Sequence, residues 1–373
     1  MSIILYAIPG FFFLIAAELI AERVKKTNYY RINDAITSLS IGVMSRVMGI
    51  LKNLVPLTFY VLIFEHLALF ALPHTWLTWV VVFIAYDFIY YWNHRFGHEV
   101  SLFWAAHVVH HSSEDYNLTT ALRQSSGSFF NFIFFIPLAI LGVDPLMFIA
   151  VASINLVYQF WVHTQHIKRL GVLEWILVTP SNHRVHHAQN QRYLDCNYGG
   201  VFIIWDRLFG SYQDELDSEK PIYGVRKALN SWNPFFANIQ VYKQLMHDSW
   251  HTQKWADKLN VWFGRTGWRP ADVDAKYSLS KTDLASFTPF DIAISTRRKF
   301  YCIAQYILTA TIAVFLMINA GQMALAWQLS IAGFLIFASV NIAWLMEKRP
   351  IANYLEIFKL LILFIGLFLV LTN

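Results

Sequence analysis

Charged residues are scarce in this sequence. Asp, Glu, Lys and Arg make up 14% of the 373 residues, against about 25% in an average soluble domain. So few charges could not cover the surface of a soluble protein of this size, and apolar residues reach 56%. The composition therefore predicts an integral membrane protein, and it excludes a disordered chain or a coiled coil.

Cysteine is nearly absent as well. The two cysteines, Cys196 and Cys302, lie far apart and no CxxC motif occurs, which excludes a disulfide scaffold and thiolate metal or redox motifs. The net charge of +5 is too mild, and too interleaved with apolar stretches, for a nucleic-acid-binding protein. It fits a membrane protein with one basic face, so no nucleic-acid partner is expected.

Long apolar stretches recur along the chain. A membrane-spanning helix needs about 20 residues, and eight stretches approach that length. Two of them, 129–142 and 145–162, are short and are expected to form a hairpin that crosses or re-enters the membrane. Residues 36–53 are amphipathic and are expected to lie along the membrane surface. The other six stretches are 3–20, 54–72, 76–93, 300–318, 322–346 and 351–371.

Lys and Arg residues assign the sides of the membrane. The loops 73–75, 143–144 and 319–321 contain none, and the positive-inside rule places the remaining, basic segments in the cytosol. We therefore predict an all-α integral membrane protein with about eight transmembrane or re-entrant helices. A cytosolic helical cap, 163–296, is expected to hold a histidine-rich two-metal site. The predicted domains are 1–299, the catalytic domain that includes the cap, and 300–373, the C-terminal transmembrane helices.

Histidine is concentrated in one part of the chain. Ten of the 14 histidines lie between His94 and His187, eight of them in one HxxxH motif and two HxxHH motifs and two in a looser HxxH. Residues three or four apart share one face of a helix, so each motif aims two or three imidazoles at one point. His163 ends the hairpin on the same side of the membrane and joins the predicted ligands. The eight box histidines are His94, His98, His107, His110, His111, His183, His186 and His187.

Clustered neutral imidazoles are typical ligands of iron, zinc, copper and nickel. Eight nitrogens exceed the about four to six that one ion binds, so the spacing predicts two metal ions. A structural zinc site closes with four ligands, and a zinc hydrolase uses three and a water, so neither needs so many histidines. A redox-active pair of irons that oxygenates a lipid C–H bond fits better. Four further histidines fit no such pattern: His66, His74, His247 and His251.

Several polar residues near the boxes are candidates to orient the imidazoles. A metal-bound imidazole usually donates its second N–H to a carboxylate, a carbonyl or water. Asp87 is a lone carboxylate in an apolar segment about two turns before His94, and intramembrane carboxylates are functional candidates by default. The alternative is that these residues only cap helices. The candidates are Asp87, Asp115, Asn117, Arg123, Gln124 and Asn197.

Beyond the boxes, the sequence resembles the fatty acid hydroxylase/sterol desaturase superfamily of membrane di-iron oxygenases. Within it, the sequence resembles the alkylglycerol monooxygenase branch over about residues 10–270. The segments that carry this resemblance are YYWNHR (90–95), His98-Glu99, HHSSEDYNLTTALRQS (110–125), LVYQFWVHT (156–164), TPSNHRVHHAQN (179–190) and NYGGVFIIWDRLFGSY (197–212).

The resemblance implies a helical membrane bundle with two irons held by the box histidines, and a catalytic role for Glu99, which directly follows His98. It implies hydroxylation of the ether-linked alkyl carbon of an alkylglycerol lipid, which gives a fatty aldehyde and a glycerol lipid. Molecular oxygen is then the oxidant and tetrahydrobiopterin the reductant. His166 departs from the family pattern, so its role as a ligand is left open, and no residues are indicated for pterin binding.

Two alternatives stay open on the sequence alone. One is a sterol or fatty-acyl hydroxylase or desaturase of the same superfamily, supplied by an external electron-transfer protein. A requirement for tetrahydrobiopterin separates it from the first interpretation. No haem-domain or dinucleotide-binding signature occurs, so either enzyme needs an external reductant system. The remote alternative is a histidine-rich metal transporter, which predicts ligands in the membrane core or on both sides of the membrane.

Overall fold

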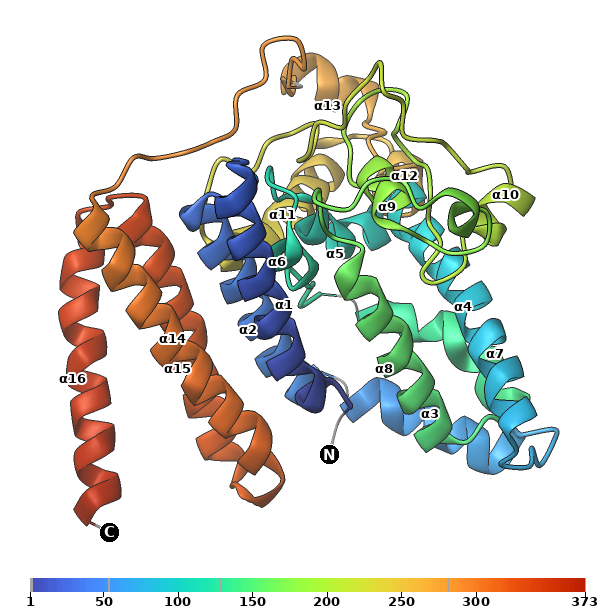
Figure 1. Cartoon of the computed structure of the whole chain (residues 1–373), viewed down its shortest axis with the longest axis horizontal. Helices are drawn as coiled ribbons and strands as arrows, with labels where there is room; N and C mark the ends of the chain where they lie inside the picture. The colour runs from blue at the N-terminus through green and yellow to red at the C-terminus, as the bar shows by residue number, and fades with distance from the viewer. Residues whose placement is uncertain (1–2, 53, 128, 281, 373) are drawn as a thin grey trace.

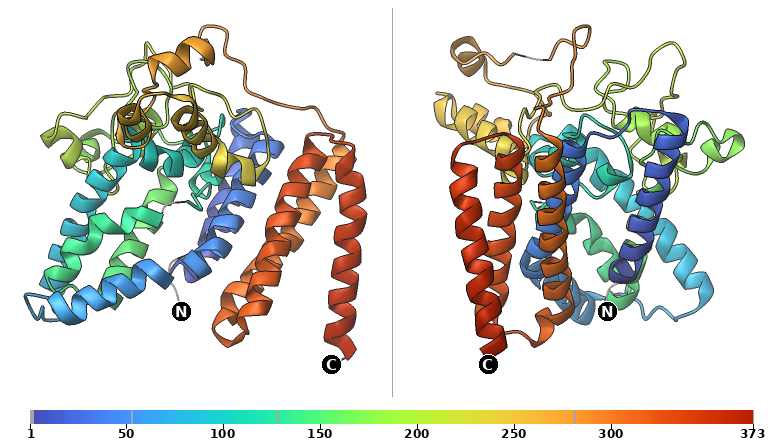
Figure 2. Two further views of the ribbon diagram at one scale, coloured as in Figure 1. Left: turned by 180° about the vertical axis from the view of Figure 1, so that it is seen from behind. Right: turned by 60° about the vertical axis from the view of Figure 1, so that its left-hand side comes forward.

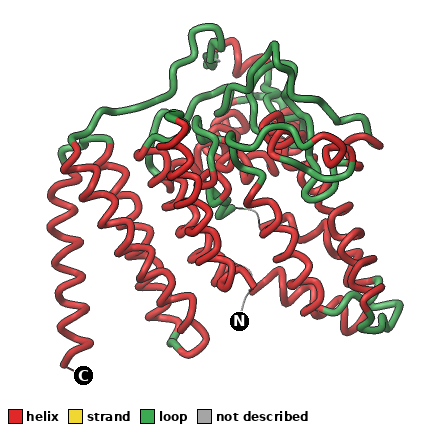
Figure 3. Tube along the Cα trace, viewed as in Figure 1, coloured by secondary structure: helices red, strands yellow, loops and turns green. Residues whose placement is uncertain are grey.

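The computed structural model describes residues 3–52, 54–127, 129–280 and 282–372, which form helices and loops without a strand (Figures 1 and 3). The absence of strands in this part of the chain confirms the expected all-helical class. The helices are α1 (Ile3–Lys25), α2 (Ile32–Lys52), α3 (Leu54–Leu67), α4 (Trp76–Glu99), α5 (Ser101–His111), α6 (Leu118–Ala121), η1 (Phe129–Phe135), α7 (Ile136–Ile140), α8 (Pro145–Trp161), η2 (Gly171–Trp175), α9 (Pro180–His186), α10 (Ile204–Leu208), α11 (Pro234–His251), α12 (Trp255–Phe263), α13 (Ala271–Lys276), α14 (Thr296–Asn319), η3 (Ala320–Gln322), α15 (Leu325–Met346) and α16 (Ile351–Thr372).

The long helices run side by side, and the short helices α9 to α13 with their loops cover one end of them (Figure 1). Both ends of the chain lie at the opposite end of the bundle. Helices α14, α15 and α16 stand together beside the rest, as the views from behind and from the side also show (Figure 2). The cap, residues 163–296, therefore closes one end of a helical bundle.

Three of the described helical spans are long and apolar enough to cross a membrane: Ile3–Lys25, Thr296–Gln322 and Leu325–Met346. A fourth arises if Ile32–Ile50 and Val55–Leu67, bent by 48°, are counted as one broken span. These criteria do not confirm the eight spans expected from the sequence. The two short stretches expected to form the hairpin at 129–162 are helical, as Phe129–Ile140 and Pro145–Trp161.

Helix α2, whose amphipathic pattern suggests a surface helix, runs within the bundle, where it packs against α14 and α15. Its apolar face is buried at Ile41, Met44 and Val47. Val47 packs in one cluster with residues of α14 and α15, including Ala313. Arg46 and Lys52 suggested a surface helix, but the remaining polar residues are small and several find partners inside the bundle.

The helix that carries the first histidine box ends at Val100, whose extended backbone (φ −115°, ψ 126°) separates α4 from α5. The chain therefore turns between the first two boxes, and α5 packs against α4. Helix α9, with the third box, begins with a capping box in which the side chains of Thr179 and Asn182 bond each other's backbone N–H. Such reciprocal caps fix where a helix begins.

Candidate metal centre

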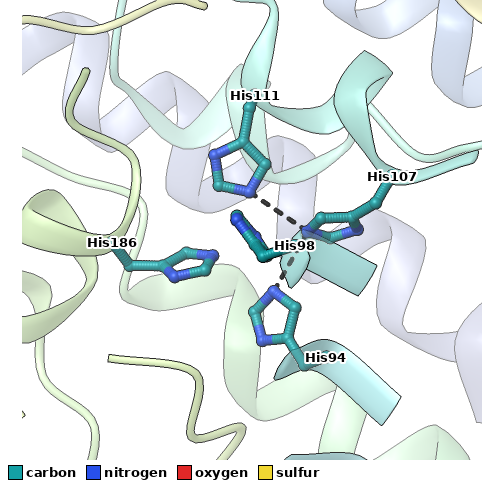
Figure 4. A group of neighbouring side chains, drawn as sticks. All are labelled: His94, His98, His107, His111 and His186. Carbon is teal, nitrogen blue, oxygen red and sulfur yellow. Dashed lines mark hydrogen bonds between the residues drawn. The ribbon is translucent and has the colours of Figure 1, made fainter. Parts of the chain in front are cut away.

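The nine histidines predicted as ligands lie in two groups. Within each group, one ring nitrogen per residue lies within 4.8 Å of the others. The larger group, shown in Figure 4, contains His94, His98, His107, His111 and His186. The smaller contains His110, His163, His183 and His187. All are buried except His107, which is half-buried.

Helices α4, α5 and α9 place the five-histidine group. Residues four apart on one helix bring His94 next to His98, and His107 next to His111. The Nε2 of His107 lies 3.0 Å from that of His94 and 3.1 Å from that of His111. His186 reaches the group from α9, on the other side of the rings in Figure 4.

The four-histidine group also takes residues from α5 and α9, and it adds one residue from the end of α8. His163 follows α8, and its Nε2 lies 3.2 Å from that of His110 and 3.1 Å from that of His183. The Nε2 of His187 lies 3.2 Å from that of His183. Because His110 and His111 are neighbours on α5, this one helix supplies ligands to both groups.

The spacing of the nitrogens suits a metal ion. Two imidazole nitrogens that each lie about 2.0–2.1 Å from one ion, about 90–110° apart, are about 2.9–3.4 Å from each other. The five Nε2–Nε2 distances of 3.0–3.2 Å fall in this range.

Backbone carbonyls fix the tautomers of several rings. The Nδ1–H of His94 donates to Tyr198 O at 2.7 Å, and that of His186 donates to Cys196 O at 3.0 Å. Carbonyls can only accept, so in each neutral ring Nε2 carries the lone pair. The Nε2 of His186 is buried with no hydrogen-bond partner, as is that of His98. Buried nitrogens of this kind are costly unless something binds them.

The same arrangement holds the four-histidine group. His110 donates its Nδ1–H to Arg123 O at 3.1 Å, and His163 donates to Gln159 O at 2.7 Å. Their two Nε2 lone pairs therefore face each other across 3.2 Å. Two lone pairs repel, and a cation between them removes the repulsion. The donor set thus fits metal ions on the orientation of its nitrogens as well as on its composition.

The buried rings are held neutral. Burial, and then the charge that a neighbouring imidazole would carry, lower the pKa of His183 and His187 well below the ordinary value of about 6.5. Burial likewise lowers the pKa of His110 to about 4. The neutral imidazole is the form that binds metals, so the site is ready for metal ions at neutral pH.

The chain is similar to known proteins along nearly its whole length. Residues 79–211 match the fatty acid hydroxylase family model. Alkylglycerol monooxygenase from Xenopus tropicalis is 37% identical over 359 residues, which cover 94% of this chain and 79% of that protein. The human alkylglycerol monooxygenase is also 37% identical, over 95% of this chain and 80% of its own length.

The chain belongs to the alkylglycerol monooxygenase family.

As a member of this family the chain is an oxidoreductase, and its relatives and apolar helices indicate an integral membrane protein. Human lathosterol oxidase matches more narrowly, at 27% identity over 137 residues, which cover 34% of this chain. No solved structure gives a significant match. The alkylglycerol monooxygenases thus match nearly the whole chain, whereas this sterol enzyme matches only part of it.

Among the residues proposed to support the ligands, Arg123 lies closest to them. Its carbonyl accepts the His110 bond, and its guanidinium is 1% exposed. The guanidinium donates to Val109 O at 3.0 Å and lies 3.5 Å from the carboxylate of Asp34. Arg123 therefore fixes the turn after α6 from which its carbonyl reaches the four-histidine group.

Asp87 and Asn197 act on the ligands indirectly, through the loop that carries Tyr198. Asp87 is fully buried and accepts bonds from the N–H groups of Val201 and Phe202, at 2.8 and 3.0 Å, and from the side chains of Asn155 and Trp205. These bonds anchor the loop that carries Tyr198, the partner of His94. Asn197, at φ +58°, donates to Asn182 O at 3.0 Å and so ties the same loop to α9.

Three further candidates have local structural partners. Asp115 pairs with Arg31 at 2.9 Å. Asn117 caps α6 by accepting from Thr119 N at 3.0 Å, and Gln124 donates to Ala121 O at 2.8 Å. Among the described residues, none of these three side chains bonds to a histidine of the two groups, so they shape the surrounding loop instead.

Glu99 and His166 lie outside both histidine groups. The Glu99 carboxylate accepts from Arg95 Nε at 2.9 Å, one turn earlier on α4, and is about one-third exposed. The ring of His166 lies 3.6 Å from the Glu22 carboxylate. The catalytic role of Glu99 stays a prediction, and in this structure its direct partner is Arg95.

Sequence reasoning missed the carbonyls that orient the rings. The chain supplies them from Arg123, Gln159, Cys196 and Tyr198. A backbone oxygen is present at every residue, so no residue type marks it. The one available signal was that the segments 156–164 and 197–212 lie among those that carry the family resemblance.

Proposed function

We propose that this protein is a di-iron monooxygenase that hydroxylates the ether-linked alkyl carbon of an alkylglycerol lipid, with tetrahydrobiopterin as the reductant. One observation carries the proposal: a chain matched along 94% of its length by an alkylglycerol monooxygenase holds two separate nitrogen-only groups, each of a size for one ion. We assign the five-histidine group to one iron and the four-histidine group to the other.

The reaction balances with one oxygen molecule and one two-electron donor. One oxygen atom enters the C–H bond next to the ether oxygen, and the other leaves as water with the two electrons and two protons of the reductant. The resulting hemiacetal loses the glycerol lipid and leaves a fatty aldehyde. Iron, when bound, supplies the redox chemistry that oxygen activation needs.

The protein's own residues prepare the site for this chemistry. The carbonyls at Tyr198, Cys196, Arg123 and Gln159 hold the imidazoles with their Nε2 atoms inward. Burial of the rings keeps them neutral and limits access of water, which protects a reactive site from side reactions. Four of the nine histidines are therefore oriented by backbone carbonyls, and burial keeps the rings in the neutral form that binds metal.

We place the site on the cytosolic side. In Figure 1 the C-terminal end of α1 and the N-terminal end of α14 lie at the same end of the bundle as the cap. Arg23 and Lys25 lie in the last turn of α1, and Arg297 and Arg298 in the first turn of α14. Basic residues at membrane boundaries favour the cytosol, which supports a cytosolic active site.

The test uses purified protein in lipid nanodiscs with iron, oxygen, an alkylglycerol and tetrahydrobiopterin. We expect fatty aldehyde to form in step with oxygen consumption, and neither to occur without the pterin. Activity with a sterol or fatty-acyl lipid and a reduced electron-transfer protein, but none with an alkylglycerol, would favour the alternative enzyme. Metal transport without oxygen uptake would contradict both.

A further inference from the structure

An apolar cavity of about 120 Å³ lies between α1, α2, α8 and α14. Its wall combines segments that are far apart in the sequence, from residue 4 to residue 317. Most of the side chains are aliphatic or aromatic. They include Ile4, Ile8, Phe11 and Phe12 of α1, Leu156 and Val157 of α8, and Ala310, Ala313, Val314 and Met317 of α14.

One part of this cavity reaches the four-histidine group. His163 itself lines the wall, together with Gln159, whose carbonyl accepts the Nδ1–H of His163 at 2.7 Å. Gln124 also lines it, and the neighbouring Arg123 supplies the carbonyl that accepts from His110. A group bound in this part of the cavity would therefore touch the candidate metal centre.

Another part of the cavity faces the surroundings of the bundle. Helices α1 and α14 are two of the spans apolar enough to cross a membrane, and both contribute wall residues. Phe12 is 43% exposed although it also lines the cavity. In a bilayer these surfaces meet lipid chains, so the cavity lies beside the hydrocarbon region.

The cavity also contains an unmatched polar group. Arg46 lines it, and among the described residues Arg46 has no hydrogen-bond or ion-pair partner. A guanidinium offers five N–H donors, and Arg46 is half-buried in the wall, so these donors are available to a ligand in the cavity. A ligand with an apolar chain and oxygen atoms at one end would satisfy both the wall and Arg46.

From these observations we propose that the cavity binds the alkyl chain of a lipid substrate, which enters sideways from the bilayer between α1 and α14. This inference rests on the proposed function for the identity of the substrate. It adds that α14, which lies outside the residues matched by the family model, forms one wall of the substrate site.

The size of the cavity limits the shape of the lipid that can bind. A cavity of about 150 Å³ accommodates a benzene molecule, so about 120 Å³ holds only a short part of a linear chain. The rest of a long chain must lie between α1 and α14 and in the bilayer. A rigid sterol ring system cannot divide itself in this way, so the site favours linear chains.

Ala310 is the position for a decisive variant. It lines the cavity and is only half-buried, whereas Ala313 is 3% exposed and packed against its neighbours. Ala310→Phe therefore adds a ring at the cavity wall, although Ala310 also packs against the buried cluster that contains Cys302 and Tyr306. Ala326→Phe, at an exposed alanine of α15, is the matched control because it adds the same ring outside the cavity.

The first readout is binding, which does not depend on turnover. The intact iron-loaded protein in nanodiscs is irradiated with an alkylglycerol that carries a diazirine in its alkyl chain. We expect labels within 3–25 and 296–319, displaced by unlabelled alkylglycerol but not by a sterol. Labelling that maps only to other helices, or that a sterol displaces, would overturn the proposal.

The second readout is kinetic. We expect Ala310→Phe to lower labelling and kcat/KM for a long-chain alkylglycerol at least tenfold with unchanged metal content, and Ala326→Phe to match the wild type. Wild-type kinetics and labelling in Ala310→Phe would overturn the proposal. If Ala310→Phe does not fold, Ala310→Leu takes its place with a smaller expected loss. Wild-type protein that is labelled as expected but cleaves no ether would contradict the proposed function alone.

Discussion

The Nε2 atoms of His110 and His163 face each other at 3.2 Å, while each ring donates its Nδ1–H to a backbone carbonyl. In the neutral state neither Nε2 has a hydrogen to share, so this pair is not a hydrogen bond. The arrangement is stable when a cation accepts both lone pairs. Metal binding and the folded arrangement of α5, α8 and α9 should therefore be coupled.

Removing His163 should empty one metal site and leave the other filled. The wild type is expected to bind about two irons, because the nine histidines form two groups. His163→Ala should retain about one, since the five-histidine group stays complete, and should lose turnover because a redox pair needs both ions. Elemental analysis and aldehyde release measure the two effects.

The matched control is His247→Ala, since His247 lies outside both groups and contacts Asp248 instead. It should keep both irons and the wild-type rate. A wild-type protein that binds a single zinc ion, and gains no activity when iron is added, would contradict the di-iron assignment.

Acid should destabilise the protein. The pKa values of His110, His183 and His187 are lowered by burial, so near pH 6.5 and below the unfolded chain binds protons that the folded chain does not. Their contribution to stability is therefore present above about pH 6.5 and is lost as the pH falls toward their folded pKa values. Tm should fall steadily between about pH 6.5 and 5.

Buried carboxylates act in the opposite direction. Burial, and then the charge of Asp34, raise the pKa of Asp115 to about 7, and burial raises the pKa of Asp206 to about 6, so their contributions to stability fall as the pH rises from about 4 to 7. The imidazoles whose pKa is lowered, nine in the two groups, outnumber these carboxylates. A Tm that rises as the pH drops from 6.5 to 5 would show that the buried imidazoles are not neutral.

Glu99→Gln should lower activity without releasing metal. Loss of a residue that supports a metal site from outside the ligand set typically costs about 10–100-fold in activity or affinity. The family resemblance implies a catalytic role for Glu99. The carboxylate contacts Arg95 rather than a histidine, so both irons should stay bound. Iron content and kcat measured on one preparation test this. Loss of iron would make Glu99 a ligand, and a full rate would remove it from the mechanism.

Asp87→Asn should destabilise the loop beside the five-histidine group. Two donors bond each carboxylate oxygen of Asp87, and an amide presents an NH2 group to two of them. The two unmatched donors should cost on the order of 3 kcal/mol, visible as a lower Tm in detergent. Asp217→Asn, at an exposed carboxylate, should leave Tm unchanged, and equal Tm values for the two variants would contradict this role.

Topology can be tested with small tags. Tags after residues 28, 215 and 349 should lie on one side of the membrane. Residue 28 follows the C-terminal end of α1, residue 215 belongs to the cap and residue 349 joins α15 to α16, and these segments lie at the same end in Figure 1. A tag after residue 320 should lie on the other side, at the far end of the α14–α15 pair. Protease protection in sealed vesicles distinguishes the sides. Residues 28 and 215 on opposite sides would contradict the arrangement.

The histidine motifs were enough to predict which side chains meet. Helical spacing alone pairs His94 with His98 and His107 with His111, and the structure brings these pairs together. The division into five and four could not be predicted, because it depends on the turn at Val100 and on His110 and His111 pointing to different groups. The direction in which a side chain points after a turn depends on tertiary packing, which the spacing of a motif does not contain.

The path of α2 shows a second limit. Arg46 and Lys52 made the segment look suited to a membrane surface, but the neighbouring Ser45 donates to Ser125 O at 2.8 Å inside the bundle. At Gly42 an added Cβ would lie 2.5 Å from Leu122 O, so the two backbones are in close contact. A periodicity argument counts polar residues, but it does not reveal which of them find partners in another segment.

Helix α1 is fastened to the protein mainly near its cap end. The Glu18 carboxylate accepts from Leu118 N at 2.8 Å and from the hydroxyls of Tyr30 and Thr164, and Ile15 packs with Leu118. Closer to the middle of the helix, Phe11 stacks on Phe160 of α8 at 4.2 Å between ring centroids. Before Phe11 no described side chain of α1 is buried, so the first turns of the helix, which also line the cavity, bend at the lowest cost. Lipids can then exchange with the cavity while the geometry of the histidines is preserved.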